Sequence, residues 1–252
     1  MRLKKWKDLP TFMQKEVIRP YYDVLSKRAA SLLLKRFFDF FVALGLLVLL
    51  SPLFLVIFIV IKRDSTGKVL FSQVRVTAYG REFRILKFRT MIECADCKGP
   101  QITAKMDSRI TRVGLFLRKY RLDEIPQLFN VLKGDMTIVG VRPESPKYVK
   151  HYSDEMIATF LLPAGITSRV SVAFKDESDM LSGEQDIETA YINKILPIKM
   201  QYNLEEIKRF SFLSDIGIMF QTLFSVWDIK HKNGHYCTGF SHITGENDNN
   251  AD

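Results

Sequence analysis

The sequence predicts an α/β protein, mostly helical, that is monotopic. It should be held on one face of a membrane by a re-entrant N-terminal membrane helix, and carry a small β-hairpin and amphipathic interfacial helices. Three patterns support this fold class. A long apolar run, residues 37–61, is interrupted by a Ser-Pro pair. Apolar and polar residues alternate over residues 68–90 around a glycine-containing turn. Towards the end of the chain, apolar residues recur with helical spacing.

Composition limits the classes of function. The 252 residues contain 37 Lys and Arg against 28 Asp and Glu, which gives a net charge of +9. Hydrophobic residues make up 47% and charged residues 26%, a balance that excludes a disordered chain and a multi-spanning membrane protein. The positive charge favours an anionic partner: nucleic acid, a membrane surface or a phosphorylated substrate. Three cysteines indicate a reducing compartment rather than a disulfide framework.

The apolar run 37–61 is long enough to cross a bilayer, yet two features favour a hairpin that returns to the same side. Pro52 removes a helix hydrogen bond mid-segment, and the Ser51 hydroxyl can satisfy a freed carbonyl, so a sharp bend is expected there. Both flanks are basic, which places both ends on the cytoplasmic side. The basic flanking residues are Lys27, Arg28, Lys35 and Arg36 before the run, and Lys62, Arg63 and Lys68 after it. A single-pass anchor remains the alternative.

Two details of this region are also predicted. Asp39 should stay at headgroup level beside Arg36, where its charge costs little. Residues 1–30 mix Lys and Arg with Trp6, Phe12, Tyr21 and Tyr22, a composition that suits a segment lying on anionic lipid. A partly ordered basic tail is the alternative for these residues.

The remaining elements follow from local patterns. Residues 68–90 should form a β-hairpin with its turn at residues 77–80, and residues 91–108 a polar loop. A short helix follows Thr111, and a second helix from Asp123 to Leu132 ends at Lys133 and Gly134, a basic last turn and a C-cap glycine. Residues 135–141 are predicted as a strand and residues 187–209 as helical. Residues 212–227 should form a helix with one apolar face, which packs on a core or lies on the membrane; that face comprises Phe212, Ile216, Met219, Phe220, Leu223 and Trp227.

The densest cluster of functional residue types is the segment LRKYRLDEIPQLFNVLKG. Because proline is tolerated only in the first turn of a helix, Pro126 places the helix start at or just before Asp123. Asp123 and Glu124 then lie at a helix N-terminus, directly after Arg118, Lys119 and Arg121. Cations of this kind keep a carboxylate ionised and can hold a phosphate, as phosphoryl transfer requires. The simpler interpretation is that Asp123 only caps the helix.

Together with KFRTM, SRITRVGLFLRK and KRFFDFFVALGLLVLLSP, the segment RLDEIPQLFNVLKGDMTIVGVRP resembles the bacterial sugar transferases that are monotopic phosphoglycosyl transferases. The resemblance runs from about Lys35 to Arg142 and resumes weakly at PAGIT and in the C-terminal helix. It implies an enzyme that moves a sugar 1-phosphate from a UDP-sugar to a polyprenyl (undecaprenyl) phosphate and releases UMP. This would be the first membrane step of glycan assembly, with Mg²⁺ as cofactor, on the cytoplasmic face of the bacterial inner membrane.

The resemblance also implies roles for individual residues. Ser51 and Pro52 match the break in the membrane helix. Asp123 matches the nucleophile that forms a covalent phosphosugar, and Glu124 the residue associated with Mg²⁺. The residues that match phosphate- or nucleotide-binding positions are Arg118, Lys87, Arg89, Arg142 and Pro143.

The sequence departs from the family pattern at three places. Val141 replaces the first proline of a Pro-Arg-Pro loop, which should leave that loop less rigid. The stretch after PAGIT lacks a Gly-Trp pair, so sugar or acceptor contacts there should differ. The chain resembles the compact form of the family, without the long multi-spanning N-terminal region of its largest members.

The resemblance divides the chain into four parts. These are a basic interfacial segment (1–36), a re-entrant membrane helix (37–61), a cytosolic catalytic domain with C-terminal amphipathic helices (62–240) and a disordered tail (241–252). The implied partners are the UDP-sugar donor, the polyprenyl phosphate acceptor, membrane lipids and other glycan-assembly enzymes. The alternatives are a non-catalytic membrane scaffold of the same fold and a glycosyltransferase that releases UDP.

Two further interpretations are weaker. Cys94 and Cys97 have the spacing of half a zinc site, but a second pair at proper spacing is missing. The residues that would have to complete it are His231, His235, Cys237 and His242. Nucleic acid is not an expected partner, because no nucleic-acid motif accompanies the basic N-terminus. The identity of the sugar, the oligomeric state and the roles of the cysteines stay open.

Overall fold

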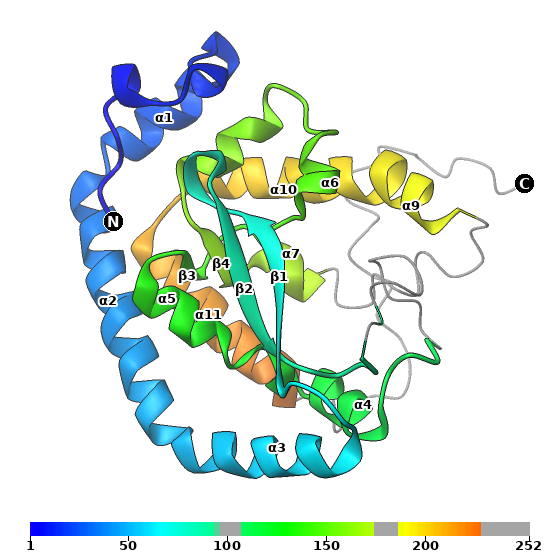
Figure 1. Cartoon of the computed structure of the whole chain (residues 1–252). Helices are drawn as coiled ribbons and strands as arrows, with labels where there is room; N and C mark the ends of the chain where they lie inside the picture. Colours follow the sequence, from blue (N-terminus) through cyan, green and yellow to red (C-terminus); the bar gives the residue numbers. More distant parts are fainter. Residues whose placement is uncertain (94, 96–106, 174–185, 228–252) are drawn as a thin grey trace, which may run out of the picture.

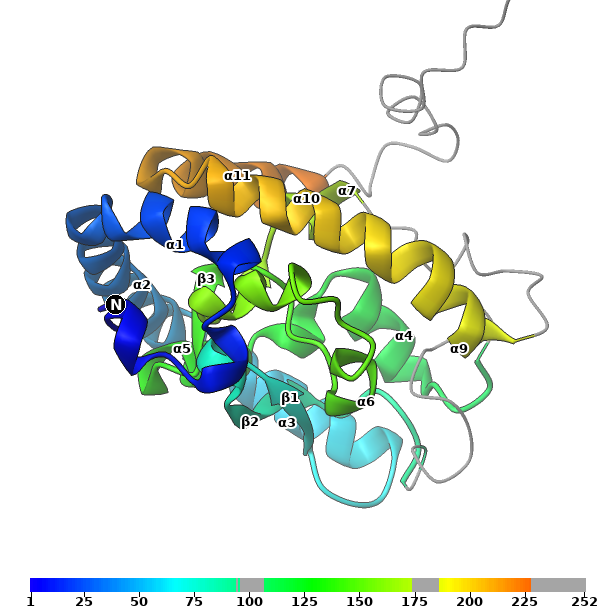
Figure 2. The same ribbon diagram turned by 90° about the horizontal axis from the view of Figure 1, so that it is seen from above.

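The computed structural model describes residues 1–93, 95, 107–173 and 186–227 (Figure 1). Across these residues the protein is mostly helical and contains two small sheets, which confirms the predicted α/β class. Helices α2 and α3 run along one side and beneath the rest of the protein (Figure 1). The two strands of the hairpin and helix α5 lie within the curve that these helices make. Seen from above, α10 and α11 lie on the opposite side of the molecule from α3 (Figure 2).

The apolar run forms α2 (Ala29–Leu49) and α3 (Ser51–Asp64), which meet at Leu50. Pro52 lies in the first turn of α3, where its missing N–H is tolerated, and the Ser51 hydroxyl donates to the Val48 carbonyl at 2.8 Å. The predicted bend is therefore confirmed, with an angle of 60°. No single helix in the described ranges has the length and hydropathy to cross a membrane, whereas the bent α2–α3 pair meets both requirements together.

Charged residues near the start of α2 fix this helix to the protein. Asp39 is 3% exposed and accepts a hydrogen bond from Thr137, so its carboxylate faces the protein. Its predicted depth at headgroup level stays a prediction. Lys35, equally buried, donates to Asp215 of α11 at 2.7 Å. Arg36 donates instead to the carbonyls of Val131 and Leu132 at 2.6 and 3.1 Å, at the end of α5 where helix carbonyls lack intrahelical partners.

The N-terminal segment is folded onto the protein through three short 3-10 turns and α1 (Arg19–Ser26). Its buried apolar residues pack against α10 and the 3-10 segment Met156–Leu161. These residues are Leu9, Met13, Ile18, Tyr21 and Leu25, each at most 3% exposed. Residues 1–26 are therefore folded rather than a partly ordered tail. Of the four aromatic residues proposed to lie on lipid, only Phe12 is exposed.

The β-hairpin is confirmed. Strands β1 (Leu70–Val76) and β2 (Glu82–Phe88) pair antiparallel from Leu70↔Phe88 to Val76↔Glu82. The turn between them is left-handed at Tyr79 and Gly80, with φ of 60° and 72°. A side chain at position 80 would also meet the ring of Phe12, which packs against this glycine.

A second sheet joins β3 (Met136–Val139) to β4 (Ala164–Thr167) in parallel. Strand β3 confirms the prediction for residues 135–141, but β4 was not predicted, since its four residues carry little alternation. Helix α6 (Pro146–Val149) and the 3-10 segment Met156–Leu161 lie in the connection, and α7 (Arg169–Ala173) follows β4.

Residues 187–208 are helical, as predicted, but not uniformly. Helix α9 (Ile187–Ala190) passes through a π-helical turn, Tyr191–Ile195, into α10 (Leu196–Lys208). Pro197, in the first turn of α10, cannot donate the usual α-helical hydrogen bond, which accounts for the wider turn before it.

Helix α11 (Phe212–Trp227) has the predicted bounds, but its buried face differs from the prediction. Ile218 is 4% exposed and packs on the core with Met219. Phe220, predicted to lie on the face that packs on a core or rests on the membrane, is 57% exposed. Leu213 is 76% exposed and Phe224 69%. The helix therefore carries a second apolar face that no described residue covers.

Helix α4 (Arg112–Lys119) approaches the chain after β2 very closely. Its N-cap Thr111 accepts a hydrogen bond from the Gly114 N–H at 3.0 Å. A Cβ at position 114 would lie 2.0 Å from the Thr90 carbonyl oxygen. Only glycine fits there, and this contact sets the position of everything that α4 carries.

We predict that Gly114→Ala lowers the free energy of unfolding by at least about 1–3 kcal/mol, because the added methyl group must push α4 away from Thr90. Gly217→Ala is the matched control: it is also helical, nothing lies within 4 Å of its new Cβ, and alanine favours a helix. Denaturant unfolding of both variants in the same detergent checks this, and equal stability of the two would refute the packing argument.

A half-buried carboxyl on α10 should make stability depend on pH. Burial raises the pKa of Glu206 from 4.5 to about 7, and Arg169, 3.4 Å away, opposes this only in part. The folded protein therefore keeps a proton on Glu206 that the unfolded chain releases above about pH 4.5.

The free energy of unfolding should consequently fall as the pH rises from about 5 to 7, by up to about 3 kcal/mol at 1.36 kcal/mol per pKa unit. Glu206→Gln should remove this part of the pH dependence and stabilise the protein above pH 7. The exposed neighbour offers the control Glu205→Gln, which should retain it. Unfolding curves at pH 5, 6, 7 and 8 decide the matter, and parallel profiles for wild type and Glu206→Gln would contradict it.

Candidate active site

The Asp-Glu pair lies in a 3-10 turn, Leu122–Glu124, rather than inside an α-helix. The prediction of one helix from Asp123 to Leu132 is therefore wrong in its first part. Helix α5 (Gln127–Lys133) begins only after Pro126, and the turn before it is entered through Arg121 in the left-handed region, with φ of 57°. Its predicted end is confirmed, because Gly134 closes it with φ of 84°.

Two hydrogen bonds from a buried amide hold α5 against β2. The Asn130 side chain is 1% exposed; it donates to the Arg84 carbonyl at 2.9 Å and accepts from the Leu86 N–H at 3.0 Å. Both partners lie on the edge of β2 away from β1, whose backbone groups would otherwise be unpaired. The Asp-Glu turn at the start of α5 is thereby fixed opposite the next residue of the strand, Lys87.

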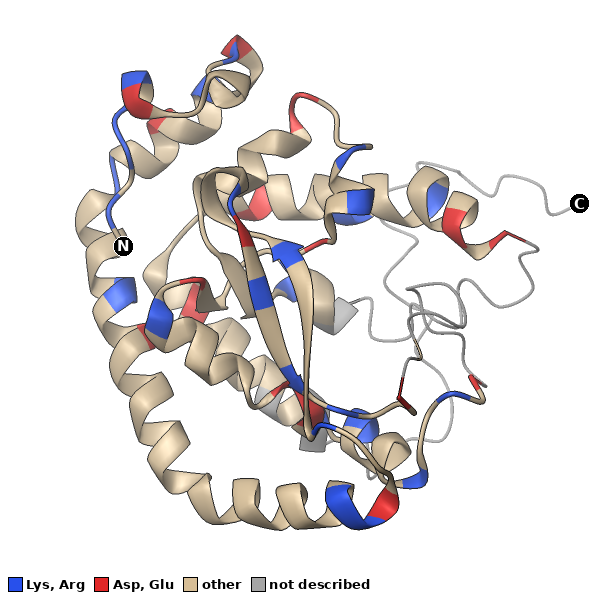
Figure 3. Ribbon diagram, viewed as in Figure 1, with Lys and Arg blue, Asp and Glu red and all other residues tan. Residues whose placement is uncertain are grey.

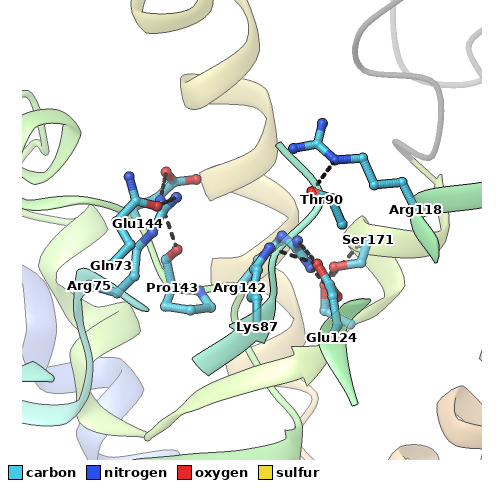
Figure 4. A network of polar contacts seen from close by, with 11 residues as sticks. Gln73, Arg75, Lys87, Thr90, Arg118, Glu124, Arg142, Pro143, Glu144 and Ser171 are labelled. Atoms are coloured by element: carbon cyan, nitrogen blue, oxygen red, sulfur yellow. Dashed lines mark hydrogen bonds and ion pairs between the residues drawn. The ribbon is translucent and has the colours of Figure 1, made fainter. Parts of the chain in front are cut away.

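Glu124 is held by two cations from different parts of the chain (Figure 4). Lys87 Nζ lies 3.0 Å from Glu124 Oε1, and the Arg142 guanidinium binds both carboxylate oxygens, one of them at 3.2 Å. Glu124 is 8% exposed. Burial alone would raise its pKa, but Arg142 and Lys87 together hold the pKa well below the usual range, so this carboxylate stays ionised.

Asp123 differs from its neighbour. It is 6% exposed, and no ion pair joins it to another described residue. Burial and then the adjacent charge of Glu124 raise the pKa of Asp123, while Lys87, Arg118 and Arg142 reduce this rise. The cations Lys87 and Arg142 form ion pairs with Glu124 and not with Asp123. Asp123 therefore has no direct ion-pair partner among the described residues, and its oxygens are not held by a cation.

The other predicted site residues divide into two groups. Arg118, on α4, donates to the Thr90 hydroxyl at 2.8 Å (Figure 4). Its charge also acts on Asp123, whose pKa it lowers. Arg89 has different partners: its guanidinium donates to the carbonyls of Ser65 and Thr66. Lys87 and Arg89 were both expected to bind phosphate or nucleotide, but β2 ends at Phe88, so the strand alternation that would place them on one face stops before Arg89.

The loop that carries Arg142 is fixed by backbone hydrogen bonds. The Gly140 N–H donates to the Thr167 carbonyl at 2.9 Å, and the Gly165 N–H donates to the Val141 carbonyl at 2.8 Å. Pro143 does not contact the pair directly; its carbonyl accepts from Arg75 at 3.4 Å. Arg75 and Glu144, which sequence reasoning missed, continue the polar network on this side (Figure 4). Arg75 could have been noticed in the sequence, because it is a polar residue in the alternating pattern of β1.

Ser51 and Pro52 lie at the α2–α3 break, away from the pair, but α3 packs beneath it. Ile57 and Ile61 of α3 join a buried apolar cluster with Phe88 and Leu117, and Leu122 packs against this cluster. Since Leu122 is the residue before Asp123, the apolar helix pair and the acidic turn are in direct structural contact.

The chemistry of the two carboxylates suits a magnesium ion that takes its other ligands from elsewhere. Within the described ranges, no group of three or more His, Cys, Asp and Glu side chains forms a metal site. Mg²⁺ commonly binds one or two carboxylates together with substrate phosphates and water. Two carboxylates lie side by side here, of which Glu124 is already paired with Lys87 and Arg142. The zinc hypothesis falls outside the described residues, as do all its ligands: Cys94, Cys97, His231, His235, Cys237 and His242.

Comparison with known proteins identifies the family of this chain. The family model described as "Bacterial sugar transferase" matches residues 30–228. The "UDP-N-acetylgalactosamine-undecaprenyl-phosphate N-acetylgalactosaminephosphotransferase" of Aeromonas hydrophila is 36% identical over 193 residues, 75% of this chain and 43% of the relative. The "UDP-glucose:undecaprenyl-phosphate glucose-1-phosphate transferase" of Escherichia coli (strain K12) is 33% identical over 210 residues, 81% of this chain and 42% of that protein.

The "Undecaprenyl-phosphate galactose phosphotransferase" of Salmonella typhimurium is 32% identical over 213 residues, 79% of this chain and 41% of the relative. This chain thus spans less than half the length of these three relatives, and their names differ in the sugar. The family match covers well over half of the chain, including the Asp-Glu turn, Lys87, Arg118 and Arg142. The chain therefore belongs to the bacterial sugar transferase family.

Proposed function

We propose that this protein transfers a sugar 1-phosphate from a UDP-sugar to a polyprenyl phosphate, undecaprenyl phosphate in bacteria, and releases UMP as the first membrane step of glycan assembly. The names of the relatives, which are undecaprenyl-phosphate sugar phosphotransferases, support the reaction class. The observation that carries the proposal is that the two neighbouring acidic side chains differ in their ion pairs. Glu124 is neutralised by Lys87 and Arg142, whereas Asp123 has no ion pair with a described residue.

The proposed reaction has two displacements at one phosphorus atom. An Asp123 carboxylate oxygen attacks the sugar-side phosphorus of the donor; the bond to the bridging oxygen breaks, and UMP leaves with the bonding electrons. A phosphate oxygen of the polyprenyl phosphate then attacks the same phosphorus, and the Asp123 carboxylate departs. Because UMP leaves before the acceptor enters, one set of cations can serve two anionic substrates in turn.

Each residue of the cluster has a part in this proposal. Lys87, Arg118 and Arg142 would stabilise the charge on the phosphoryl oxygens, which is the main requirement of phosphoryl transfer. Glu124 would orient Lys87 and Arg142 and contribute a ligand to Mg²⁺. When bound, Mg²⁺ would neutralise part of the charge of the diphosphate.

We further propose that α2 and α3 enter the membrane and return to the cytoplasmic side. Between the first turns of α2 and the last turn of α3 the surface of these helices carries no charged residue (Figure 3). Many of their apolar side chains are exposed, among them Phe41 at 64% and Leu49 at 72%. Large exposed apolar surfaces of this kind mark membrane contact.

The bend determines how deep such a pair would reach. If the 60° bend is shared equally, each arm slopes at about 30° to the membrane plane. The 13 residues of 37–49 span about 20 Å as a helix and would descend about 10 Å. This is less than half of the roughly 30 Å hydrocarbon core, so the pair fits one leaflet. Since Leu122 packs on α3, Asp123 would then lie near the headgroups, where the acceptor phosphate is.

We predict that Asp123→Asn lowers UMP release at least about a thousandfold and abolishes covalent labelling by a donor radiolabelled in the sugar, because the nucleophilic oxygen is lost. Asp135→Asn is the matched control, since this aspartate pairs with the exposed Arg81 outside the cluster and should leave activity intact. Purified protein with Mg²⁺, UDP-sugars and undecaprenyl phosphate provides the assay. Full turnover by Asp123→Asn would refute the covalent route, and a silent wild type across the donor panel would refute the proposed activity.

We predict that both termini of the protein are accessible only from the cytoplasm, and that Pro52→Ala moves part of the population into a spanning form by restoring a continuous helix. Pro20→Ala, in the first turn of α1 and outside the membrane pair, should leave the topology unchanged. Protease accessibility of terminal tags in sealed inverted vesicles measures this. Protection of the N-terminal tag in the wild type would exclude the re-entrant form.

A further inference from the structure

A small polar cavity adjoins the acidic turn on the side away from Arg118. Its volume is about 160 Å³, and its walls include Lys87 and Arg142, the two cations that bind Glu124. Figure 4 shows Arg75 and Glu144 beyond Arg142, on the opposite side from Thr90 and Arg118. The lining also includes Gln127 from α5, Tyr148 from α6, Tyr191 from the π-helical turn and Lys199 from α10.

Two polar side chains in the lining of this cavity are almost completely buried. Gln127 is 1% exposed and Tyr148 is 3% exposed, yet Gln127 Nε2 and the Tyr148 hydroxyl have no hydrogen-bond partner among the residues that the structure describes. A buried polar group left unpaired costs on the order of 1–3 kcal/mol. Two such groups lining one cavity indicate that a polar ligand completes their hydrogen bonds.

Next to Tyr148, the lining presents an anionic acceptor. Tyr191 donates to Glu144 Oε1 at 2.6 Å, and Lys199 Nζ lies 3.1 Å from the Tyr191 hydroxyl and 3.6 Å from Glu144. Arg75 lies 3.9 Å from the other carboxylate oxygen. These contacts hold the Glu144 carboxylate in place. The cavity therefore offers fixed hydrogen-bond acceptors and donors side by side.

We propose that this cavity binds the sugar of the nucleotide-sugar donor and that Gln127 and Tyr148 read its hydroxyl or amide substituents. This inference rests on the proposed function. In that reaction the sugar is bonded to the phosphorus that Asp123 attacks, so it must lie directly beside the cations that hold this phosphate. A hexose presents a donor and an acceptor at nearly every carbon, which matches a wall that contains Glu144, Gln127 and Tyr148.

Size and shape favour the sugar over the rest of the donor. Pockets for drug-sized ligands measure about 300–1,000 Å³, so a cavity of about 160 Å³ holds one ring and not a whole nucleotide sugar. A uracil ring usually needs an open aromatic face to stack on. The rings of Tyr148 and Tyr191 pack against each other instead, with centroids 5.0 Å apart and planes at 58°.

The Tyr148 hydroxyl remains a neutral donor and acceptor at physiological pH, because burial, reinforced by the charges of Glu188 and Glu144, raises the pKa of Tyr148 to about 12. Tyr148→Phe removes only this hydroxyl and leaves the packing of the ring on Tyr191 intact. Gln127→Met removes the amide at nearly constant length. Tyr22→Phe is the matched control, since the Tyr22 hydroxyl donates to the Lys4 carbonyl in the N-terminal segment.

The test is the ratio of kcat/KM between donors that differ at one substituent: UDP-glucose against UDP-galactose, and each against its N-acetylated counterpart. Tyr148→Phe and Gln127→Met should change at least one of these ratios tenfold or more, since a site built to pair a substrate group discriminates through it. Inhibition by UMP, which carries no sugar, should stay unchanged, and Tyr22→Phe should alter neither quantity.

Unchanged ratios in both variants would overturn the proposal. So would an equal loss for all donors combined with weaker UMP inhibition, because that result assigns the cavity to the nucleotide. If the wild type releases no UMP with any donor, the proposed function fails instead. Calorimetric binding of the same UDP-sugars and of UMP, which needs no turnover, then tests the cavity separately: loss of donor discrimination in Tyr148→Phe supports it, and unaltered discrimination in both variants refutes it.

Discussion

The ion pairs of Glu124 with Lys87 and Arg142 are the interaction around which the site is organised. They join the acidic turn, strand β2 and the loop after β3, three segments far apart in the sequence. Removing either cation would leave the buried Glu124 carboxylate with one partner fewer, which costs stability, so these ion pairs help to hold the three segments together. The same pairing makes the two neighbouring acids unequal. Glu124 is held by two cations, whereas Asp123 has no ion pair with a described residue, as the proposed nucleophile would require.

The elements that carry this cluster are held together by close contacts between neighbouring residues. Asn130 fixes α5 to β2 through two backbone hydrogen bonds, and Gly114 lets α4 approach Thr90, the partner of Arg118. From below, Ile57 and Ile61 of α3 pack in the cluster that also receives Leu122. The apolar helix pair is thus part of the support of the acidic turn, not a separate anchor. This coupling gives a physical reason why a reaction with a lipid-borne phosphate would be built on such a fold.

Lys87 and Arg142 contact the acidic turn and also line the cavity, so the two proposed sites share these cations. On one side of Arg142 lies the acidic turn, where the phosphoryl group would be transferred. On the other lies the cavity, where Gln127 Nε2 and the Tyr148 hydroxyl have no hydrogen-bond partner among the described residues. The three relatives compared here are named for different sugars although they belong to one family. A division of this kind, with shared cations for the phosphate and a separate polar wall for the sugar, would allow the donor to change without disturbing the chemistry.

The sequence by itself determined the parts that depend on neighbouring residues. Alternation predicted the hairpin over 68–90, Gly134 the end of α5, Thr111 the start of α4, and the Ser51-Pro52 pair the bend between α2 and α3. The acidic pair and its cations Lys87, Arg118 and Arg142 were also recognisable from sequence.

Only the tertiary structure decided which partner each side chain takes. It turned Arg89 to the carbonyls of residues 65 and 66, buried Asp39 against Thr137, added the parallel strand β4 and enclosed Gln127 and Tyr148 in one cavity. The physical reason is range: capping, turns and periodicity act over a few residues, whereas ion pairs and cavities depend on segments that meet only after the chain has folded.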